Sequence, residues 1–280
     1  MTQEPGFQVF PRISRDGAKL AFLSHAAHND EVWLLDLTTG KRLLLSTKVS
    51  IKFKPILHAD GSRVAYTEAG EDALYAVSSS GGPAEKLCER CGWPWDWSAD
   101  QRRILHIGRD SRGSPNPASM LNLQTGKGAV FVERGSMGAP HQLHWSTDNR
   151  WIVFIAGSSQ KPILYVAPFS GDQGPPETAW IPITDGSTDE ENTPYWSPDG
   201  NWIYSVSTRD GYSCLWAYPL DPQTKRPAGK PADVFHSHGS RLSLRNANQV
   251  SLELSVAHDK IVFNQGEITG NIWMTTLPAN

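Results

Sequence analysis

A short pattern of aromatic, small and acidic residues recurs along the chain and limits the folds that it can adopt. Its clearest copy is Trp196-Ser197-Pro198-Asp199-Gly200, which is followed three residues later by the aliphatic anchor Ile203. In the six copies, several of them degenerate, this anchor is Leu20, Val64, Ile104, Ile152, Ile203 and Ile261. Consecutive anchors lie 44, 40, 48, 51 and 58 residues apart. Repeats of this length are typical of solenoids, propellers and arrays.

Each repeat unit contains the same order of expected elements. The Ser-x-Asp-Gly segment predicts a turn, because Ser and Asp side chains bond nearby backbone N–H groups and Gly tolerates a positive φ. An alternating strand such as 151–155 follows, then a third strand such as 163–166 and a fourth such as 42–45. Four strands per unit predict an all-β, six-bladed β-propeller with about four antiparallel strands in each blade. The expected units are residues 7–48, 49–90, 91–134, 135–186, 187–236 and 237–280.

Composition agrees with a single domain that spans residues 1–280. The 280 residues include 24 Gly, 20 Pro and 11 Trp, which suits many short strands joined by tight turns. The net charge of −3 provides no basic surface for nucleic acid, and no apolar run approaches the roughly 18 residues of a membrane-spanning helix. We therefore expect no nucleic-acid partner, no membrane span in this chain, and a monomer.

The repeat carries a family resemblance. The pattern Pro-x-Trp-Ser-x-Asp-Gly-x-x-Ile-x-Phe resembles the repeats of TolB-type β-propellers, a fold also found in oligogalacturonate lyases, in dipeptidyl peptidase IV-like and tricorn-type proteases, and in bacterial regulators and kinases. Two segments, Gly81-Gly82-Pro83 and Gly270-Asn271-Ile272-Trp273, look most like propellers appended to bacterial sensors and kinases. The resemblance implies a propeller that works in the periplasm or outside the cell.

The two ends of the chain bear on how the ring closes. The last unit reaches its expected third strand, 271–274, and ends near Leu277 without a fourth. Ring closure would then need an N-terminal strand, but only 13 residues precede Ser14. We therefore expect a fragment of a longer protein or an incomplete closing blade, unless residues 1–6 complete the sixth blade. Residues 1–5 lack the basic start and apolar core of a signal peptide, so the location rests on the resemblance alone.

Three cysteines are too few for a disulfide scaffold. Cys88 and Cys91 lie between the second and third units, where they are free thiols, a local disulfide, or a metal or redox pair. A lone Cys-x-x-Cys provides only two of the four ligands that a structural zinc site needs. Cys214 lies in an expected third strand and is assigned to the core.

One of the two histidine pairs in the chain is a candidate metal site. His141 and His144 flank Gln142 on an expected inner strand, and resemblance to oligogalacturonate lyases, which hold a metal in a histidine-rich channel site, makes them candidates for a divalent ion. Residues three apart on a regular strand point to opposite faces, so these two share an ion only if the strand is bulged. His236 and His238 lie in the long loop before the sixth unit. The alternative is surface or capping histidines and no cofactor.

Indole faces stack on sugars, but most of the eleven tryptophans have a place in the repeat and are expected to pack between blades. Trp95 is one of three that the repeat does not explain. With Asp96 it lies on an expected inner strand near the channel mouth. Trp95 is therefore a ligand-facing residue or, alternatively, a core residue.

The sequence lacks the common catalytic motifs, including Gly-x-Ser-x-Gly, His-Glu-x-x-His and a phosphate-binding Gly-rich loop. Carboxylates that converge on the channel remain candidates for catalysis. Asp96 and Glu253 would then be the catalytic residues of a glycoside hydrolase or uronide lyase. Glu190 and Glu191 either join them or belong to a solvated acidic loop.

Taken together, these features favour a non-catalytic sensing or scaffolding module that binds a protein, peptide or carbohydrate at the channel mouth. The alternative is a carbohydrate-active enzyme with its site in the central channel. Candidate ligand-binding residues depart from the repeat and lie on or near inner strands: Arg12, Lys52, Lys54, Trp95, His141, Tyr195, Arg245 and Asn246.

Overall fold

The structure is a computed structural model of the 280-residue chain. It describes residues 7–26, 29–46, 48–109, 115–132, 138–158, 160–170, 174–188, 190–247, 250–270 and 274. These residues form 24 strands and one short 3₁₀ helix, η1 (Glu177–Ala179), so the all-β prediction is confirmed. None of the described segments is a helix with the length and apolarity that crossing a bilayer requires.

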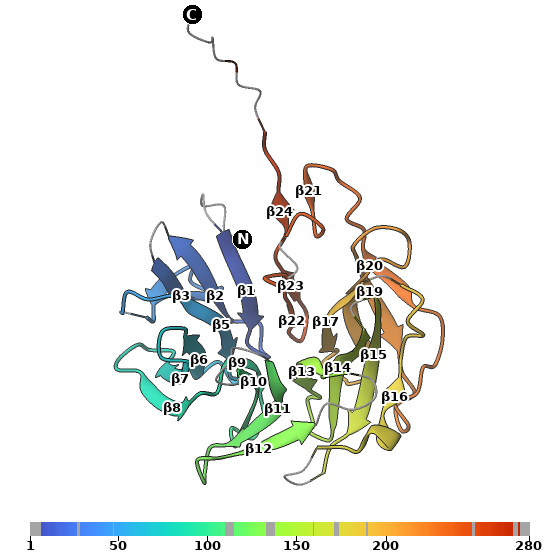
Figure 1. The fold of residues 1–280 in the computed structure, drawn as a ribbon. Coiled ribbons are helices and arrows are strands. Elements are labelled where there is room, and N and C mark those ends of the chain that lie inside the picture. The colour runs from blue at the N-terminus through green and yellow to red at the C-terminus, as the bar shows by residue number, and fades with distance from the viewer. Residues whose placement is uncertain are drawn as a thin grey trace, which may run out of the picture.

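Five four-stranded antiparallel sheets make up most of the molecule (Figure 1). In each sheet, strands that follow one another in the chain also pair with one another. The sheets comprise β1 (Phe7–Ile13), β2 (Lys19–Ala26), β3 (Asn29–Asp36) and β4 (Arg42–Leu44); β5 (Lys52–Leu57), β6 (Arg63–Glu68), β7 (Ala73–Ser78) and β8 (Glu85–Glu89); β9 (Trp93–Trp97), β10 (Arg103–Arg109), β11 (Pro115–Asn122) and β12 (Lys127–Val132); β13 (His141–Trp145), β14 (Trp151–Ser158), β15 (Lys161–Pro168) and β16 (Ile181–Pro182); and β17 (Glu191–Trp196), β18 (Trp202–Ser207), β19 (Cys214–Pro219) and β20 (Ala232–Phe235).

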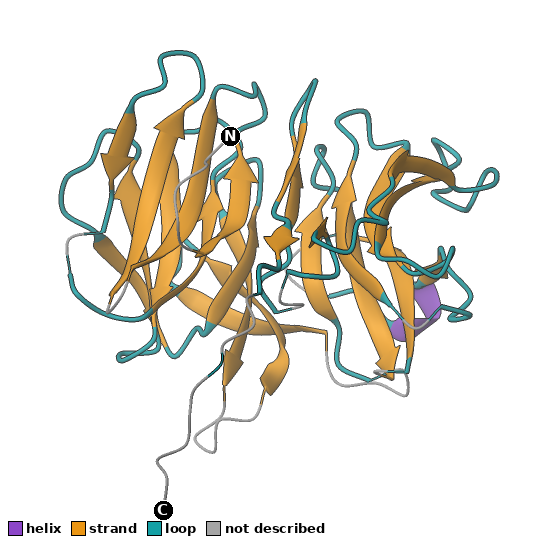
Figure 2. Ribbon diagram, turned by 90° about the horizontal axis from the view of Figure 1, so that it is seen from above, coloured by secondary structure: helices purple, strands orange, loops and turns teal. Residues whose placement is uncertain are grey.

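The first strand of every sheet faces the centre of a ring. Inner strands β1, β5, β9, β13 and β17 contact one another in that order, and β22 (Leu254–Val256) contacts both β17 and β1, which closes the circle. Figure 2 views the same sheets from above and shows the 3₁₀ helix at the outside of the molecule. This arrangement is a β-propeller, and it directs one strand from each unit toward the axis.

The prediction of six blades was wrong, because the described residues form five four-stranded blades. The sixth unit instead provides two separate two-stranded sheets. One pairs β22 with β23 (Ile261–Phe263), and the other pairs β21 (Leu242–Ser243) with β24 (Gly266–Glu267).

Asn264 gives a physical reason for the short pairing of β22 with β23. Its Oδ1 accepts a hydrogen bond from Glu253 N–H (2.9 Å), and its Nδ2 donates to the carbonyl of Ser251 (3.1 Å). Side-chain bonds thus replace the backbone ladder at the point where a longer second strand would continue. Residues 1–6 and 271–273, which bear on the expected closing and third strands, lie outside the described residues.

The Ser-x-Asp-Gly turn has the predicted construction. In the fifth blade, the Ser197 hydroxyl donates to Asp199 (2.5 Å) and accepts from Trp202 N–H (2.9 Å), while Asp199 also accepts from Asn201 N–H (3.1 Å). Gly200 has a φ of 70°, a left-handed conformation that glycine adopts without steric cost. The recurring motif is therefore a corner between the first two strands of a blade.

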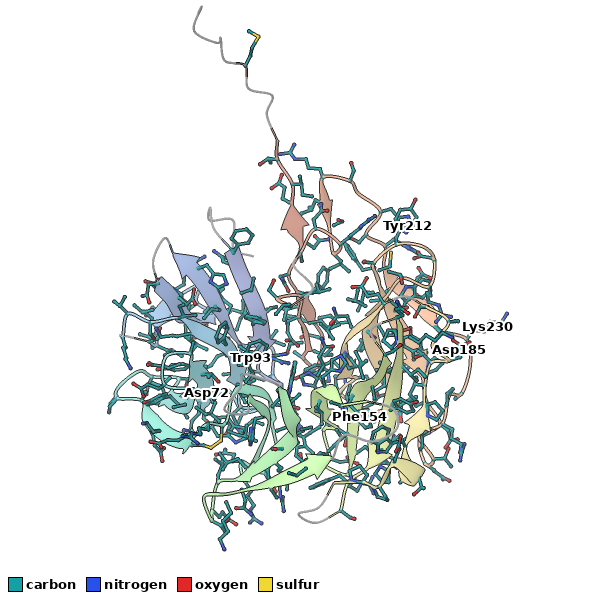
Figure 3. The ribbon with its side chains drawn as sticks, viewed as in Figure 1. Asp72, Trp93, Phe154, Asp185, Tyr212 and Lys230 are labelled. Carbon is teal, nitrogen blue, oxygen red and sulfur yellow. A yellow bond between two sulfur atoms is a disulfide. The ribbon has the colours of Figure 1, made fainter. Side chains whose placement is uncertain are left out.

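Aromatic residues of the repeat pack between adjacent blades, as predicted. Trp196 is 2% exposed, lies in one cluster with Val153 and Leu164 of the fourth blade, and donates from Nε1 to the carbonyl of His144 (3.1 Å). Phe154, labelled in Figure 3, is fully buried in the cluster shared by the third and fourth blades. Each such buried side chain contributes about 1.5–3 kcal/mol, so packing between blades holds the ring together.

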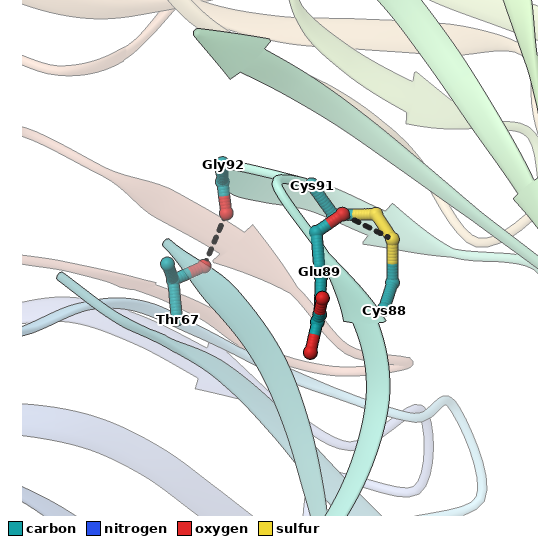
Figure 4. The surroundings of a disulfide bond; sticks show 5 residues. All are labelled: Thr67, Cys88, Glu89, Cys91 and Gly92. Carbon is teal, nitrogen blue, oxygen red and sulfur yellow. Dashed lines mark hydrogen bonds between the residues drawn. A yellow bond between two sulfur atoms is a disulfide. The ribbon is translucent and has the colours of Figure 1, made fainter. Parts of the chain in front are cut away.

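Cys88 and Cys91 form a disulfide between β8 and β9, with their Cα atoms 5.9 Å apart (Figure 4). Next to it, the Thr67 hydroxyl donates to the carbonyl of Gly92. Of the alternatives that the sequence left open, the structure thus contains the local disulfide. Cys214 is free and buried, as predicted.

Candidate functional site

The inner strands bring seven of the predicted site residues together around the centre of the ring. We call this set the channel cluster. It contains Arg12 from β1, Lys54 from β5, Trp95 and Asp96 from β9, His144 from β13, Tyr195 from β17, and Glu253 immediately before β22.

Bulges direct these side chains inward. The pairing of β1, β5, β9, β13 and β17 with the next strand shifts register in each case. Lys54 itself has a φ of 43°, and residues with positive φ lie two positions before Arg12, His144 and Tyr195. A bulge bends a strand and re-aims a side chain. The bulged strand that His141 and His144 would need in order to share an ion is therefore present.

Glu253 lies at the centre of a buried ion-pair network. Its Oε1 is 3.1 Å from Arg12 Nη2 and its Oε2 is 2.7 Å from Lys54 Nζ, and all three side chains are buried. Burial opposes ionisation of Glu253, but the Arg12 and Lys54 charges hold its pKa below the ordinary value. Burial also lowers the pKa of Lys54 to about 8, even though Glu253 favours the ammonium form. Glu253 is therefore an ionised carboxylate at neutral pH.

The His144 imidazole lies between the two carboxylates of the channel cluster. Its Nδ1 is 3.6 Å from Asp96 Oδ2 and its Nε2 is 3.9 Å from Glu253 Oε1. Burial and the nearby Arg12 charge lower the pKa of His144, which favours the neutral ring. Asp96 accepts hydrogen bonds from the backbone N–H groups of Trp97 (2.9 Å) and Trp145 (2.8 Å). Both carboxylates are therefore held by protein groups.

This geometry does not favour Asp96 and Glu253 as a glycosidase pair. Such an enzyme needs one carboxyl group with a raised pKa, and space for a sugar between the two. Here Glu253 has a lowered pKa, and His144 lies between the carboxylates. The cavity that Asp96 lines holds about 70 Å³ and is not lined by Glu253. It is far smaller than the roughly 300–1,000 Å³ of a typical ligand site.

Trp95 and Lys52 occupy structural positions. Trp95 is 8% exposed, with Lys54 Nζ 3.3 Å from its ring centroid, and its carbonyl accepts a hydrogen bond from Arg12 (3.1 Å). Lys52 is fully buried, and its ammonium donates to the carbonyls of Asp30 (3.0 Å), Lys48 (2.5 Å) and Ser50 (3.2 Å). Lys52 thus ties the first blade to the second and is not part of the channel cluster.

The other ligand-binding candidates lie elsewhere. Asn246 donates from Nδ2 to the carbonyls of Ser240 (3.1 Å) and Arg241 (3.0 Å), and so holds its own loop. Arg245 is exposed and lines a polar hollow of about 520 Å³ next to the fifth blade. His141 is partly buried, with Nδ1 3.5 Å from the carbonyl of Ala139, and burial lowers its pKa. Among the described residues, no group of three metal-ligating side chains includes His141 or His144.

Sequence reasoning missed the mouth of the ring on the side of the Ser-x-Asp-Gly turns. Arg15 reaches from the first blade to the fourth, where its Nη2 donates to the carbonyl of Thr147 (3.1 Å). It also lines an open hollow of about 720 Å³. We call this hollow the turn-side mouth, and its polar lining residues are Arg15, Asp16, His58, Asp60, Gln101, His258 and Asp259. These residues belong to turns of the repeat, so their sequence signal was assigned entirely to structure.

Glu191 differs from the solvated acidic residue considered in the sequence. It is 5% exposed and accepts hydrogen bonds from the hydroxyls of Ser207 (3.0 Å), Thr188 (3.1 Å) and Tyr218 (3.2 Å). Burial raises its pKa to about 7, although these hydroxyls lower it. Glu191 therefore joins the fifth blade internally and lies outside the channel cluster.

Comparison with known proteins bears on the fold. No family model matches the chain. The Tol-Pal system protein TolB of Francisella tularensis is 22% identical over 217 residues, which are 75% of this chain and 48% of that protein. The chain thus spans about half the length of the curated relatives that it matches.

Two solved structures are similar to this chain in fold. A putative TolB from Agrobacterium tumefaciens matches with a TM-score of 0.65 and 19% identity over 84% of this chain and 82% of that one. TolB from Acinetobacter baumannii matches with a TM-score of 0.62 and 16% identity over 76% of this chain and 52% of that one. The β-propeller expected from the repeat is therefore confirmed, with five four-stranded blades among the described residues in place of the expected six.

Proposed function

Since the chain folds as a TolB-like β-propeller, we propose that it is a non-catalytic module that binds a protein or peptide at the turn-side mouth. One observation carries this proposal. Glu253, a buried carboxylate of the channel cluster, is paired with Arg12 and Lys54 at 3.1 and 2.7 Å, so its charge is balanced inside the channel. The open space for a partner lies instead at the mouth.

The chemistry of the turn-side mouth suits a polar polypeptide. Its lining combines the Arg15 guanidinium with the carboxylates of Asp16, Asp60 and Asp259. Several turns supply these groups, and the blades beneath hold the turns in place. Loops on a rigid scaffold are common binding surfaces. The name of the relatives, Tol-Pal system protein, supports a search for a protein partner.

We also propose a periplasmic location for the module. The Cys88–Cys91 disulfide supports an oxidising compartment, because disulfides persist there and are rare in the cytosol. The carbohydrate-active alternative gains no support from the channel, where the carboxylates are occupied and the cavity is narrow.

A crosslinking experiment tests the proposed surface. A photo-reactive amino acid replaces Gln101 at the mouth in one variant and Lys230 at the outer edge in another (Figure 3). After expression in the periplasm, we expect a discrete protein adduct from position 101 and none from position 230. The adduct partner, identified by mass spectrometry and then purified, should bind Asp259→Arg at least about tenfold more weakly than the unmodified protein, a loss of about 1.4 kcal/mol.

Two results would contradict the proposal. One is an adduct that forms equally from both positions, because the mouth would then have no special role. The other is hydrolysis or cleavage of a glycan by the purified chain that Glu253→Gln abolishes while circular dichroism stays unchanged. That second result would establish the enzyme alternative.

A further inference from the structure

Four metal-ligating side chains converge at the outer end of the fifth blade, away from the channel cluster. We call them the edge cluster: Asp210, Cys214, His236 and His238. Each offers one ligand atom, and the four atoms all lie within 4.8 Å of one another. We propose that the edge cluster is a four-ligand site for a divalent transition-metal ion, with zinc as its best chemical match.

Strand pairing brings the four residues together. Strands β19 and β20 pair with Leu215 opposite Phe235, so Cys214 and His236 follow at the same end of this pair. Asp210 lies in the turn that leads into β19, close to Tyr212, which Figure 3 shows at the outside of the molecule. His238 comes two residues after His236 and returns to the same turn. Ligands from two segments of one blade therefore meet in one place.

The donor atoms are already spaced for a small ion. Asp210 Oδ1 accepts from Tyr212 N–H (3.1 Å), which leaves Oδ2 facing the two imidazoles. Oδ2 is 3.1 Å from His238 Nε2 and 3.4 Å from His236 Nδ1. Donors around tetrahedral zinc lie about 3.3–3.8 Å apart, given bond lengths of about 2.0–2.3 Å. No two of the four donor atoms are more than 4.8 Å apart, so the most distant pair needs to approach by only about 1 Å to reach that range.

The groups that contact the four ligand side chains are also of the kind that orient ligands in metal sites. His236 Nε2, the nitrogen on the far side of the ring, is 3.4 Å from Asp233 Oδ2. A carboxylate in this position orients a ligating imidazole. Ser237 N–H donates to Cys214 Sγ (3.3 Å), and the Tyr212 ring stacks on His238 with a centroid distance of 4.1 Å. With the hydrogen bond from Tyr212 N–H to Asp210 Oδ1, all four ligands thus have a second contact that fixes their orientation.

The ligand types and their exposure favour zinc in a structural role. Cysteine and histidine are typical zinc ligands, and a site with four protein ligands is closed to substrate. The side chains of His236 and His238 are 47% and 46% exposed, so an ion has a path from solvent, whereas Cys214 closes the inner side. A bound ion would tie the β18–β19 turn to the segment after β20 and so fix the outer end of the fifth blade.

Metal titration of the purified chain tests the proposal. The protein is freed of metal with a chelator, with its Cys88–Cys91 disulfide left oxidised, and titrated with zinc chloride by calorimetry and with cobalt chloride by absorption. We expect one ion per chain and a cobalt spectrum with tetrahedral bands and a thiolate charge-transfer band. His238→Ala and His236→Gln should each weaken zinc binding by more than about tenfold. Cys214→Ser should remove the charge-transfer band.

The matched control is His25→Gln, which alters an exposed histidine beside Asp30 in the first blade and should bind zinc like the unmodified protein. Circular dichroism establishes that each variant is folded. If one of the two histidine variants does not fold, the other still tests the site. The proposal would be overturned by the lack of stoichiometric binding, by equal weakening in His25→Gln, or by a charge-transfer band that persists in Cys214→Ser. Weakening by His141→Gln to the level of His238→Ala would place the ion in the channel and overturn it as well.

Discussion

The channel cluster and the edge cluster contain similar side chains but differ in how their charges are balanced. In the channel, two cations, Arg12 and Lys54, face two carboxylates, Asp96 and Glu253, around the buried ring of His144. At the edge, Asp210 lies against two imidazoles that are about half exposed. A buried cluster that contains its own counter-charges needs no added ion to balance them. Ligand atoms gathered near the surface are instead suited to bind an added cation.

This difference explains why polar residues near a propeller axis are not by themselves evidence of catalysis. In the channel, the Arg12 and Lys54 charges outweigh the desolvation of Glu253, so removal of this carboxylate should affect stability first. At the edge, the same types of side chain contribute little to folding until an ion joins them. The comparison therefore makes opposite predictions for stability and for metal affinity.

Glu253→Gln should have the largest effect, because it leaves Arg12 and Lys54 buried without a counter-charge. Loss of one partner of a buried pair costs about 3–5 kcal/mol. Urea unfolding at neutral pH, followed by tryptophan fluorescence, measures the free energy of unfolding. The control is Glu267→Gln, which breaks an exposed pair with Arg241 (2.8 Å) and should cost less than about 1 kcal/mol. Equal losses in the two variants would show that the channel network is no more important than a surface ion pair.

The sequence predicted the fold better than it predicted the contacts within the two clusters. The turn residues and the four-strand order are local, so five of the six blades predicted from the repeat are present as four-stranded sheets. The sixth unit differs, because its described residues form two separate two-stranded sheets. The Asn264 side chain lies where the β22–β23 pairing ends, and a single asparagine gives no such signal in sequence. The number of repeat units in the sequence therefore does not give the number of complete four-stranded blades.

Site residues were foreseen by position but not by interaction. Arg12 and Lys54 lie near the same point of their units, which placed them on inner strands. Their pairing with Glu253 depends on closure of the ring, since 241 residues separate Arg12 from Glu253. At the edge, the proximity of Cys214 and His236 depends on the register of β19 and β20. Such contacts follow from tertiary structure and not from local pattern.

The next largest effect should be a change of the free energy of unfolding with pH, caused by titration of Lys54. Its pKa in the folded chain is about 8, below the value near 10.5 expected in the unfolded chain. Between these values the unfolded chain binds more protons, so the free energy of unfolding rises with pH, by at most about 3 kcal/mol across the window. Lys54→Met should lack this rise, as denaturant titrations from pH 7 to 10 would show.

Lys260→Met is the control for that comparison. Lys260 pairs with Asp259 at the surface (2.6 Å), so its loss should leave the pH-dependent rise in place. A rise of the same size in Lys54→Met would mean that Lys54 titrates normally despite its burial. The channel would then be more hydrated than its packing indicates.

Asp233→Asn should produce a smaller and different effect, confined to metal affinity. Its carboxylate lies 3.4 Å from His236 Nε2, where it would orient the ring without touching the ion. Outer carboxylates of this kind change metal affinity by about 10–100-fold. Competition between the protein and a chromophoric zinc chelator measures the change. Unaltered affinity in Asp233→Asn, together with normal zinc binding by the parent chain, would show that this carboxylate has no orienting role.

His238→Ala, studied without metal, should have the smallest effect of the four. The ring is 46% exposed and its loss removes one contact with Asp210 and one stack on Tyr212, so the free energy of unfolding should change by less than about 0.5 kcal/mol. Addition of zinc should then raise the unfolding midpoint of the parent chain but not of the variant, because an ion that binds only the folded state stabilises it by mass action. A large loss of stability without metal would instead place His238 among the residues that hold the fold, as Glu253 does, and would remove the distinction between the two clusters.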